Sequence, residues 1–89
     1  MARIIFSPAI QRHVQIDEQS VPAKTLREAL HAVFALKPAL RDYIVDEQDR
    51  LRKHVTLFID NEQIDARRDL DQAIADDAEI YVVQALSGG

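Results

Sequence analysis

One amphipathic helix, set among segments of strand-like composition, is the feature that most constrains the fold of this chain. Its apolar side chains recur at helical spacing: Leu26, Leu30, Val33 and Phe34. Thr25 and Glu28 match a capping box, in which side chains bond the free amide groups of the first turn. Pro38 disfavours helical geometry at the residue before it and ends the pattern. The sequence therefore predicts a helix over residues 25–36, whose apolar stripe must pack against another element.

Strand-like segments stand on both sides of this helix. The first is rich in β-forming residues, and a loosely alternating segment after Pro8 is predicted to pair back onto it as a hairpin. The clearest two-residue period follows the helix, and Asp60-Asn61 then predicts a turn into a short edge strand. The predicted strands are residues 3–7, 12–16, 54–60, 63–65 and 79–85. The predicted connections are the loops 17–24 and 39–53, the second with a short irregular turn, and a polar segment, 66–78, anchored by Leu70 and Ile74.

The order of these elements favours one architecture. A single helix stripe is best buried against one face of a mixed sheet of four to five strands. The first and last strands are the natural central neighbours of such a sheet and would run parallel to each other. This α+β arrangement is the β-grasp of ubiquitin-like domains. We expect a single domain over residues 1–86, followed by a flexible C-terminal tail at residues 87–89.

The composition excludes several classes of protein. The 89 residues include no cysteine, so the chain itself holds no disulfide, zinc–thiolate site or thiol nucleophile. No apolar run approaches the ~18 residues of a membrane-spanning helix, and the N-terminus lacks the pattern of a secretion signal. We therefore expect a cytoplasmic protein that is a monomer when free and has no membrane partner.

The formal charge of −4 is unevenly distributed along the chain. Residues 1–40 carry a net charge of +2, whereas residues 41–89 carry −6. An acidic half argues against a nucleic-acid partner, because such binding depends on Lys and Arg side chains that neutralise phosphates. Two readings of the acidic residues stay open: they dock on a basic protein surface near the tail, or they form a solvated face that aids solubility.

No group of residues in the chain has the pattern of a catalytic site. No spacing typical of metal ligands links the three histidines, His13, His31 and His54. No nucleophile-elbow context surrounds the serines Ser7, Ser20 and Ser87. A phosphate-binding loop requires internal glycines, which this chain lacks. We expect that the chain is not an enzyme and that it binds no cofactor or metal itself.

The only two glycines of the chain, Gly88 and Gly89, are its last two residues. A pair of residues without side chains can enter a narrow site, where the α-carboxylate of Gly89 would be the group acted on. A carboxylate is a poor electrophile, but joining it to AMP creates a good leaving group, and the product is a thioester, an isopeptide or a thiocarboxylate. Leu86 and Ser87 would link this end to the last strand. The alternative is a frayed terminus that merely ends in small residues.

Three parts of the sequence match the pattern of a known family. They are residues 51–64, which contain the predicted strand and hairpin, residues 70–80, which lead into the last strand, and residues 85–89, which end in Gly-Gly. On these segments, and over nearly its whole length, the chain resembles the MoaD/ThiS family of small sulfur-carrier proteins. Within that family it is most similar to the CysO-like carriers of an alternative route to cysteine.

Two turns depart from the family pattern. Asp60-Asn61 stands where the family often has Asn-Gly or Asn-Asp, and because Asn tolerates a positive φ we still expect a hairpin there. Asp77-Ala78-Glu79 replaces the family's aspartate-glycine-aspartate turn, so we expect a different backbone geometry before the last strand.

The resemblance implies a cycle with three partners. A ubiquitin-activating-type adenylyltransferase uses ATP to adenylylate Gly89, a sulfur donor converts the adenylate to a thiocarboxylate, and a sulfur-accepting biosynthetic enzyme delivers the sulfide. In the family the acceptor is a molybdopterin precursor, a thiazole precursor of thiamin, or an activated serine on the way to cysteine. ATP and the sulfur donor are used by the partner enzymes. Two alternatives stay open: a protein modifier attached to lysines through Gly89, and a passive β-grasp interaction domain.

The face of the sheet opposite the helix is predicted to hold a docking surface. Strand alternation directs Ile4, Phe6, Ile80 and Val82 toward the helix if these residues form the core. The residues then left on the opposite face are Ile5, Phe58, Tyr81 and Val83. Exposed aromatic and aliphatic side chains on adjacent strands are typical of a partner surface. The alternative is that loops half cover ordinary sheet residues.

Overall fold

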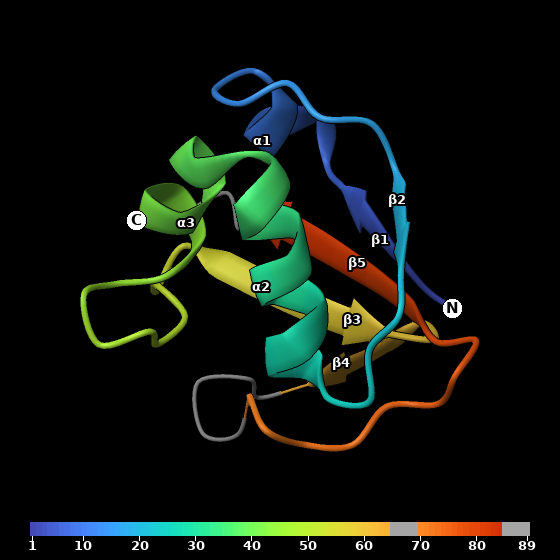
Figure 1. Ribbon diagram of the computed structural model, residues 1–89. Helices are drawn as coiled ribbons and strands as arrows, with labels where there is room; N and C mark the ends of the chain where they lie inside the picture. Colours follow the sequence, from blue (N-terminus) through green and yellow to red (C-terminus); the bar gives the residue numbers. More distant parts are fainter. Residues whose placement is uncertain (65–69, 85–89) are drawn as a thin grey trace.

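The computed structural model describes residues 1–64 and 70–84 of the chain. Its first four elements are β1 (Ala2–Phe6), α1 (Pro8–Gln11), β2 (Gln19–Val21) and α2 (Leu26–Leu36). The remaining four are α3 (Pro38–Ile44), β3 (Val55–Ile59), β4 (Glu62–Ile64) and β5 (Glu79–Gln84). Figure 1 shows these elements in order along the chain. None of the helices in these two ranges is long and apolar enough to cross a membrane.

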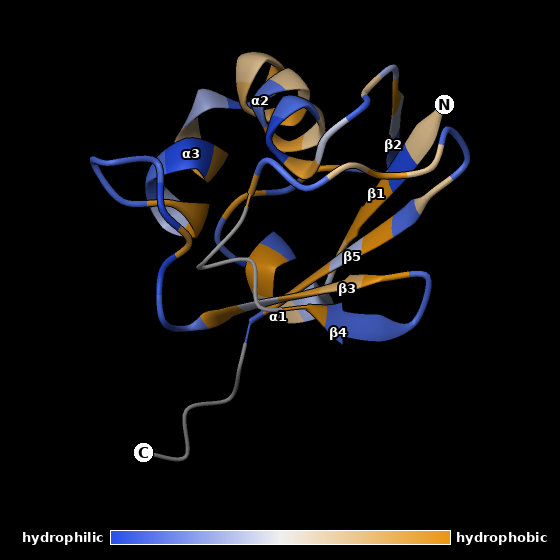
Figure 2. Cartoon of the chain, turned by 90° about the horizontal axis from the view of Figure 1, so that it is seen from below, coloured by the Kyte–Doolittle hydropathy of each residue, from blue (hydrophilic) through white to orange (hydrophobic). Residues whose placement is uncertain are grey.

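The strands form one mixed sheet in the order β2-β1-β5-β3-β4. The first and last strands, β1 and β5, lie side by side at its centre and run parallel, whereas the other pairs are antiparallel. Both α2 and α3 lie on one side of the sheet (Figures 1 and 2). This is the α+β, β-grasp fold, and it confirms the predicted architecture.

The predicted central helix is confirmed as α2, together with the cap at its start. The side chain of Thr25 accepts a hydrogen bond from the Glu28 amide at 3.2 Å, and the Glu28 carboxylate accepts one from the Lys24 amide at 2.9 Å. The apolar stripe faces the sheet, and its buried members are Leu26, Ala29, Leu30, Val33 and Phe34. Segment 70–74 runs along the first turn of α2, where the Leu26 amide donates to the Gln72 carbonyl at 3.1 Å.

Two helices lie where the sequence predicts none. Segment 39–53 is predicted as a loop, but α3 occupies its first part and buries Leu40 and Ile44 completely. The shorter α1 follows directly on β1 and buries Ile10. Each of these helices begins with a proline, Pro8 or Pro38. Proline suits the first helical position because the amide it lacks has no partner there.

The predicted second strand over residues 12–16 is wrong. The chain leaves α1 through a turn and an irregular stretch, in which buried Ile16 anchors it to the core. It pairs with β1 only later, as β2, inside the segment predicted as a loop over residues 17–24. Ala2 lies opposite Val21 in this antiparallel pair. Because α1 takes up the residues next to β1, the tight hairpin that the sequence suggests cannot form.

Both unusual turns are explained by backbone geometry. Asp60 and Asn61 have φ angles of 51° and 70°, and they join β3 to β4 in a two-residue hairpin. Before β5, the Ala78 amide donates to the Ala75 carbonyl at 3.1 Å, and Ala78 is completely buried. Among the described non-glycine residues, a positive φ occurs only at Asp60, Asn61 and Asp49. The turn before β5 therefore needs no left-handed residue, which explains why it can hold an alanine.

Candidate functional site: the outer face of the sheet and the base of the tail

The four predicted docking residues lie on one face of three adjacent strands. We call this side, turned away from α2, the outer face; its apolar members are Ile5, Phe58, Tyr81 and Val83. Ile5 pairs with Tyr81 across β1 and β5, and Tyr81 pairs with Phe58 across β5 and β3, so these three side chains form a row. Val83 stands two residues further along β5, opposite Thr56. The structure thus brings the predicted residues together, and their role in docking stays a prediction.

Exposure separates this row from its neighbours in the same strands. Ile80 and Val82 are completely buried, whereas Tyr81 between them is 37% exposed. Ile5, Phe58 and Val83 are half-buried. Met1, Leu36 and Tyr81 are the large hydrophobic residues most exposed in the described ranges, and only Tyr81 lies in the middle of the sheet. The outer face therefore presents a continuous apolar row with an aromatic side chain at its centre.

A polar group borders the row where β5 begins. The Arg3 guanidinium donates to the Glu18 carboxylate at 2.7 Å and to the Glu79 carboxylate at 3.1 Å. The hydrogen bond with Glu18 raises the pKa of Arg3, and the same bond lowers the pKa of the Glu18 carboxyl. All three side chains are substantially exposed, so these ion pairs add little to stability. They place a polar rim beside an apolar centre, an arrangement common in protein interfaces.

At the other end of β5, side chains from distant elements hold Gln84, the last described residue before the tail. Its amide donates to the Ser7 hydroxyl at 3.4 Å, and its side-chain oxygen accepts a hydrogen bond from the Tyr43 hydroxyl. The Tyr43 ring stacks on His13, with centroids 4.9 Å apart, and meets His54 edge-on at 5.1 Å. We call Ser7, His13, Tyr43, His54 and Gln84 the tail-base cluster. Sequence reasoning missed this grouping, because its contacts link residues 41 and 77 positions apart.

Gly89, whose carboxylate is predicted to be acted on, and Gly88 before it in the predicted tail lie outside the described residues. So do Leu86 and Ser87, which are predicted to link them to the last strand. The structure therefore places the end of β5, from which the tail starts, and leaves the predictions for the tail untested.

Among the described residues, one group of acids from the second half lies where β5 begins, at the opposite end of that strand from the tail base. Its members are Asp60, Glu62, Asp76, Asp77 and Glu79. The Asp60 amide donates to the Glu79 carbonyl at 2.9 Å, which fixes the β3–β4 hairpin at this end. Gln84 ends the six-residue strand, ~17 Å away at the usual rise per residue. One of the two hypotheses for the acidic residues is that they dock on a basic partner near the tail. These five acids lie at the opposite end of β5 from the tail base.

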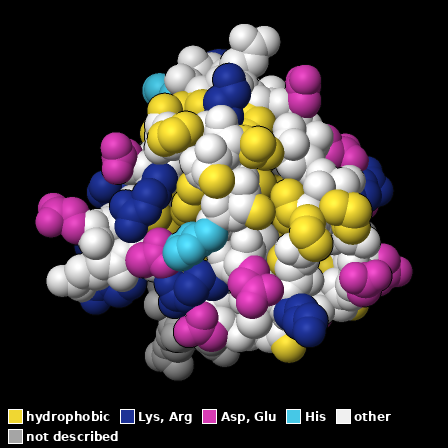
Figure 3. Space-filling model, viewed as in Figure 1, with side chains coloured by type: hydrophobic (Ala, Val, Ile, Leu, Met, Phe, Trp, Pro, Cys, Tyr) yellow, Lys and Arg dark blue, Asp and Glu magenta, His cyan; other side chains and the backbone are white. Residues whose placement is uncertain are grey.

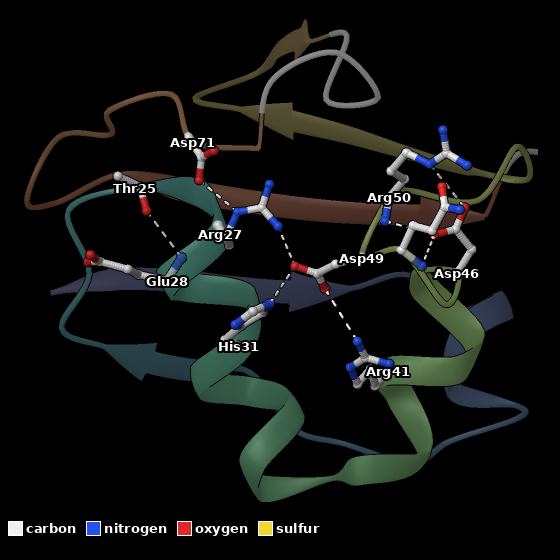
Figure 4. A network of polar contacts seen from close by, with 10 residues as sticks. Thr25, Arg27, Glu28, His31, Arg41, Asp46, Asp49, Arg50 and Asp71 are labelled. Carbon is white, nitrogen blue, oxygen red and sulfur yellow. Dashed lines mark hydrogen bonds and ion pairs between the residues drawn. The ribbon is translucent and has the colours of Figure 1, made fainter.

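A charged network on the helix-bearing face is neutralised within the chain. The Asp49 carboxylate accepts hydrogen bonds from Arg27 and His31, and Arg41 lies 3.8 Å from its second oxygen (Figure 4). Arg27 also donates to Asp71 at 2.6 Å, and this bond raises the pKa of Arg27. The network ties α2, α3 and the loop after α3 together. Acidic and basic side chains are interspersed over this face (Figure 3), unlike the apolar row on the outer face.

Within residues 1–64 and 70–84, no three His, Cys, Asp or Glu side chains gather closely enough to hold a metal ion. His13 and His54 instead pack on Tyr43, and His31 belongs to the Asp49 network. Ser7 is buried and bonded to the Gln84 amide. The three histidines and Ser7 thus make contacts within the described part of the fold.

Comparison with known proteins adds evidence at the level of the fold. No protein-family model matches the chain, and no curated protein matches it. Solved structures do. The chain superposes on CysO in the Amycolatopsis orientalis BexX/CysO complex with a TM-score of 0.82, 14% identity and 100% of both chains covered. The chain has the ubiquitin-like β-grasp fold.

Two further solved structures match the fold of this chain to a similar degree. CysO from Mycobacterium tuberculosis matches with a TM-score of 0.80 and 17% identity, covering 97% of this chain and all of that one. SAMP1 from Haloferax volcanii matches with a TM-score of 0.75 and 20% identity, covering 99% of this chain and 98% of that one. The resemblance to small carriers of the MoaD/ThiS type, and to CysO in particular, is thus confirmed in the fold. These neighbours are small carrier or modifier proteins rather than enzymes.

Proposed function

We propose that this chain is a small sulfur carrier whose C-terminal Gly89 is converted to a thiocarboxylate by partner enzymes. The observation that carries the proposal is the end-to-end fold match with CysO, combined with a sequence whose only glycines form its last two residues. The neighbours support a carrier or modifier role. The terminal Gly88 and Gly89 suit activation of the Gly89 carboxylate, which a carrier and a modifier would share.

The proposed chemistry takes place in the partners' active sites. A carboxylate oxygen of Gly89 attacks the α-phosphate of ATP, and pyrophosphate leaves. A sulfur nucleophile then attacks the carbonyl carbon of the acyl-adenylate, and AMP leaves. ATP and the sulfur donor are bound by the partners, and residues 1–86 serve as the domain that they recognise. The thiocarboxylate keeps the sulfur nucleophilic and tethered until an accepting biosynthetic enzyme uses it for cysteine, molybdopterin, thiamin or a related product.

The outer face gives such partners a surface to dock on. Its apolar row lies on β1, β5 and β3, and β5 leads directly to the tail. Five residues follow Gln84, which limits the reach of the Gly89 carboxylate to ~17 Å from the end of the strand. A partner that docks on the outer face must therefore hold its ATP site within this distance of Gln84.

Intact-mass measurement tests the proposal. The chain is incubated with an adenylyltransferase of the ubiquitin-activating type, ATP and a sulfur source, and the expected product is heavier by the exchange of one oxygen for sulfur. The chain without Gly89 is the control and should keep its mass. If the mass of the complete chain never changes and no acyl-adenylate forms, the proposal is wrong.

A second function is favoured by the SAMP1 neighbours, one of which is a small archaeal modifier protein from Methanosarcina acetivorans. We propose as the alternative that Gly89 forms an isopeptide bond with lysines of other proteins. Conjugates of the tagged chain in cell extract, absent when Gly89 is deleted, would support this function. A passive interaction domain, by contrast, would keep its binding and its phenotype without Gly88 and Gly89.

A further inference from the structure

The end of β5 is held more firmly than strand pairing alone requires. Gln84 already pairs with Val55 of β3. In addition, its amide reaches the hydroxyl of Ser7, a residue that stands immediately before α1. A serine in this position commonly caps the helix with its side chain, but the Ser7 side chain makes no such bond. Ser7 is only 6% exposed, and its hydroxyl is aimed at the last strand instead.

Tyr43 of α3 makes the second contact with Gln84. Its hydroxyl donates to the side-chain oxygen of Gln84, across 41 positions of sequence. His13 stacks on one side of the ring with an interplanar angle of 28°, and His54 meets it edge-on at 72°. Two aromatic neighbours from different segments thus fix the ring, and with it the hydroxyl. Gln84 is held through its backbone by Ser7 and through its side chain by Tyr43.

We propose that Tyr43 and Ser7 are positioning residues, which fix the point and the direction in which the chain leaves β5 toward Gly89. This inference rests on the proposed function and names the residues that serve it. Val83 of the outer face is the residue directly before Gln84. For a partner docked on this face, the start of the tail would therefore lie at a constant place relative to the partner's ATP site. Holding a reacting group in the right place raises the rate at which the carrier–enzyme complex reacts, rather than the affinity of the carrier for the enzyme.

The two regions should therefore affect different steps. The apolar row of the outer face contributes to the affinity between carrier and enzyme, since that is the surface buried on docking. The tail-base cluster contributes to the turnover of the docked complex, because it does not lie on the outer face. Tyr43→Phe removes only the hydroxyl and keeps the ring between His13 and His54, so the packing of α3 is preserved.

The test measures adenylylation of the full chain by its activating enzyme at saturating carrier, together with the Kd of the carrier–enzyme complex. For Tyr43→Phe we expect the turnover to fall about 2- to 10-fold, the effect of losing one hydrogen bond, with Kd within about twofold of the wild type. Ser7→Ala should act in the same direction. Ser20→Ala, a change of the same kind at an exposed position of β2 opposite Arg3, is the matched control and should leave the turnover unchanged.

A second readout examines the cluster without any enzyme. Hydrogen exchange at the Gln84 amide, followed by NMR, should be faster in Ser7→Ala, and the Gln84 side-chain amide signals should shift in Tyr43→Phe. Unchanged turnover in both variants, while the wild type is activated, overturns the inference and leaves the proposed function intact. A rise in Kd with unchanged turnover also overturns it. If the wild type is not adenylylated at all, the proposed function fails first and the positioning role fails with it.

Discussion

The two faces of the sheet differ in what covers them: the helices bury an apolar inner face, whereas the outer face carries a short apolar row among polar residues. On the inner face, Leu57, Ile80 and Val82 are completely buried beneath the helices. On the outer face, Phe58 is half-buried and Tyr81 is 37% exposed, and polar residues stand beside this row in the same strands. An antiparallel sheet with one solvated face usually alternates apolar and polar residues along each strand. Folding explains the apolar inner face, and we propose that a partner's surface covers the apolar row of the outer face.

The largest expected effect separates folding from activation altogether. Gly88→Val adds a β-branched side chain to a tail that we propose must enter a narrow site, so we expect activation by the adenylyltransferase to be lost. The thermal unfolding midpoint should stay the same, since the proposed domain ends before this residue. An assay of adenylate formation measures activation, and calorimetry measures the unfolding midpoint. A marked fall in the unfolding midpoint would show that the tail belongs to the folded structure.

The next effect probes the inner face. Leu57→Ala removes a completely buried side chain from the middle of β3 and leaves a cavity beneath the helices. We expect the free energy of unfolding, measured in denaturant, to fall by about 2–5 kcal/mol. Partner affinity should stay the same for the fraction that remains folded. A loss of unfolding free energy well below this range would mean that the inner face is not tightly packed beneath the helices.

The adjacent residue probes the outer face. Phe58→Ala removes a side chain in contact range of its cross-strand partner Tyr81, so we expect to lose only about 0.2–1 kcal/mol of unfolding free energy. Affinity for the activating enzyme should fall more, by about 1–3 kcal/mol or roughly 5- to 150-fold in Kd, since aromatic side chains dominate interfaces. Titration calorimetry and denaturant unfolding give the two numbers. A stability loss equal to that of Leu57→Ala would place Phe58 in the core and remove the contrast between the faces.

Much of this contrast could be predicted from the sequence, because strand alternation is a local property. A two-residue period determines which residues share a face, and the residues named for the outer face do lie together. The capping box locates α2 for the same reason. The two other helices could also be found, since Pro8 and Pro38 each stand at a first helical position. A proline that is interpreted only as the end of an element does not predict the helix that begins there.

Other features have no local signature. β2 consists of Gln-Ser-Val, of which only the valine favours strands, and its place is set by pairing with β1. Ser7 and Tyr43 meet Gln84 only because the sheet and α3 bring distant segments together. The same holds for Asp49, whose carboxylate collects partners from two helices. Such contacts follow from tertiary packing, so the sequence alone predicts the outer face but not the tail-base cluster.

The smallest expected effect concerns the polar rim of the outer face. The hydrogen bond from Arg3 lowers the pKa of Glu18 in the folded chain, so the charged carboxylate favours the folded state. This contribution is present above the unfolded pKa of the group and is lost as the pH falls through the folded value. Glu18→Gln should therefore melt slightly below the wild type at about pH 7, and the difference should shrink as the pH falls through the lowered pKa of the Glu18 carboxyl. Glu62→Gln, which removes the same charge on the β3–β4 hairpin, is the control. A difference specific to Glu18 that grows in acid would show that the rim does not act through this ion pair, and that the outer face is bordered by groups with another role.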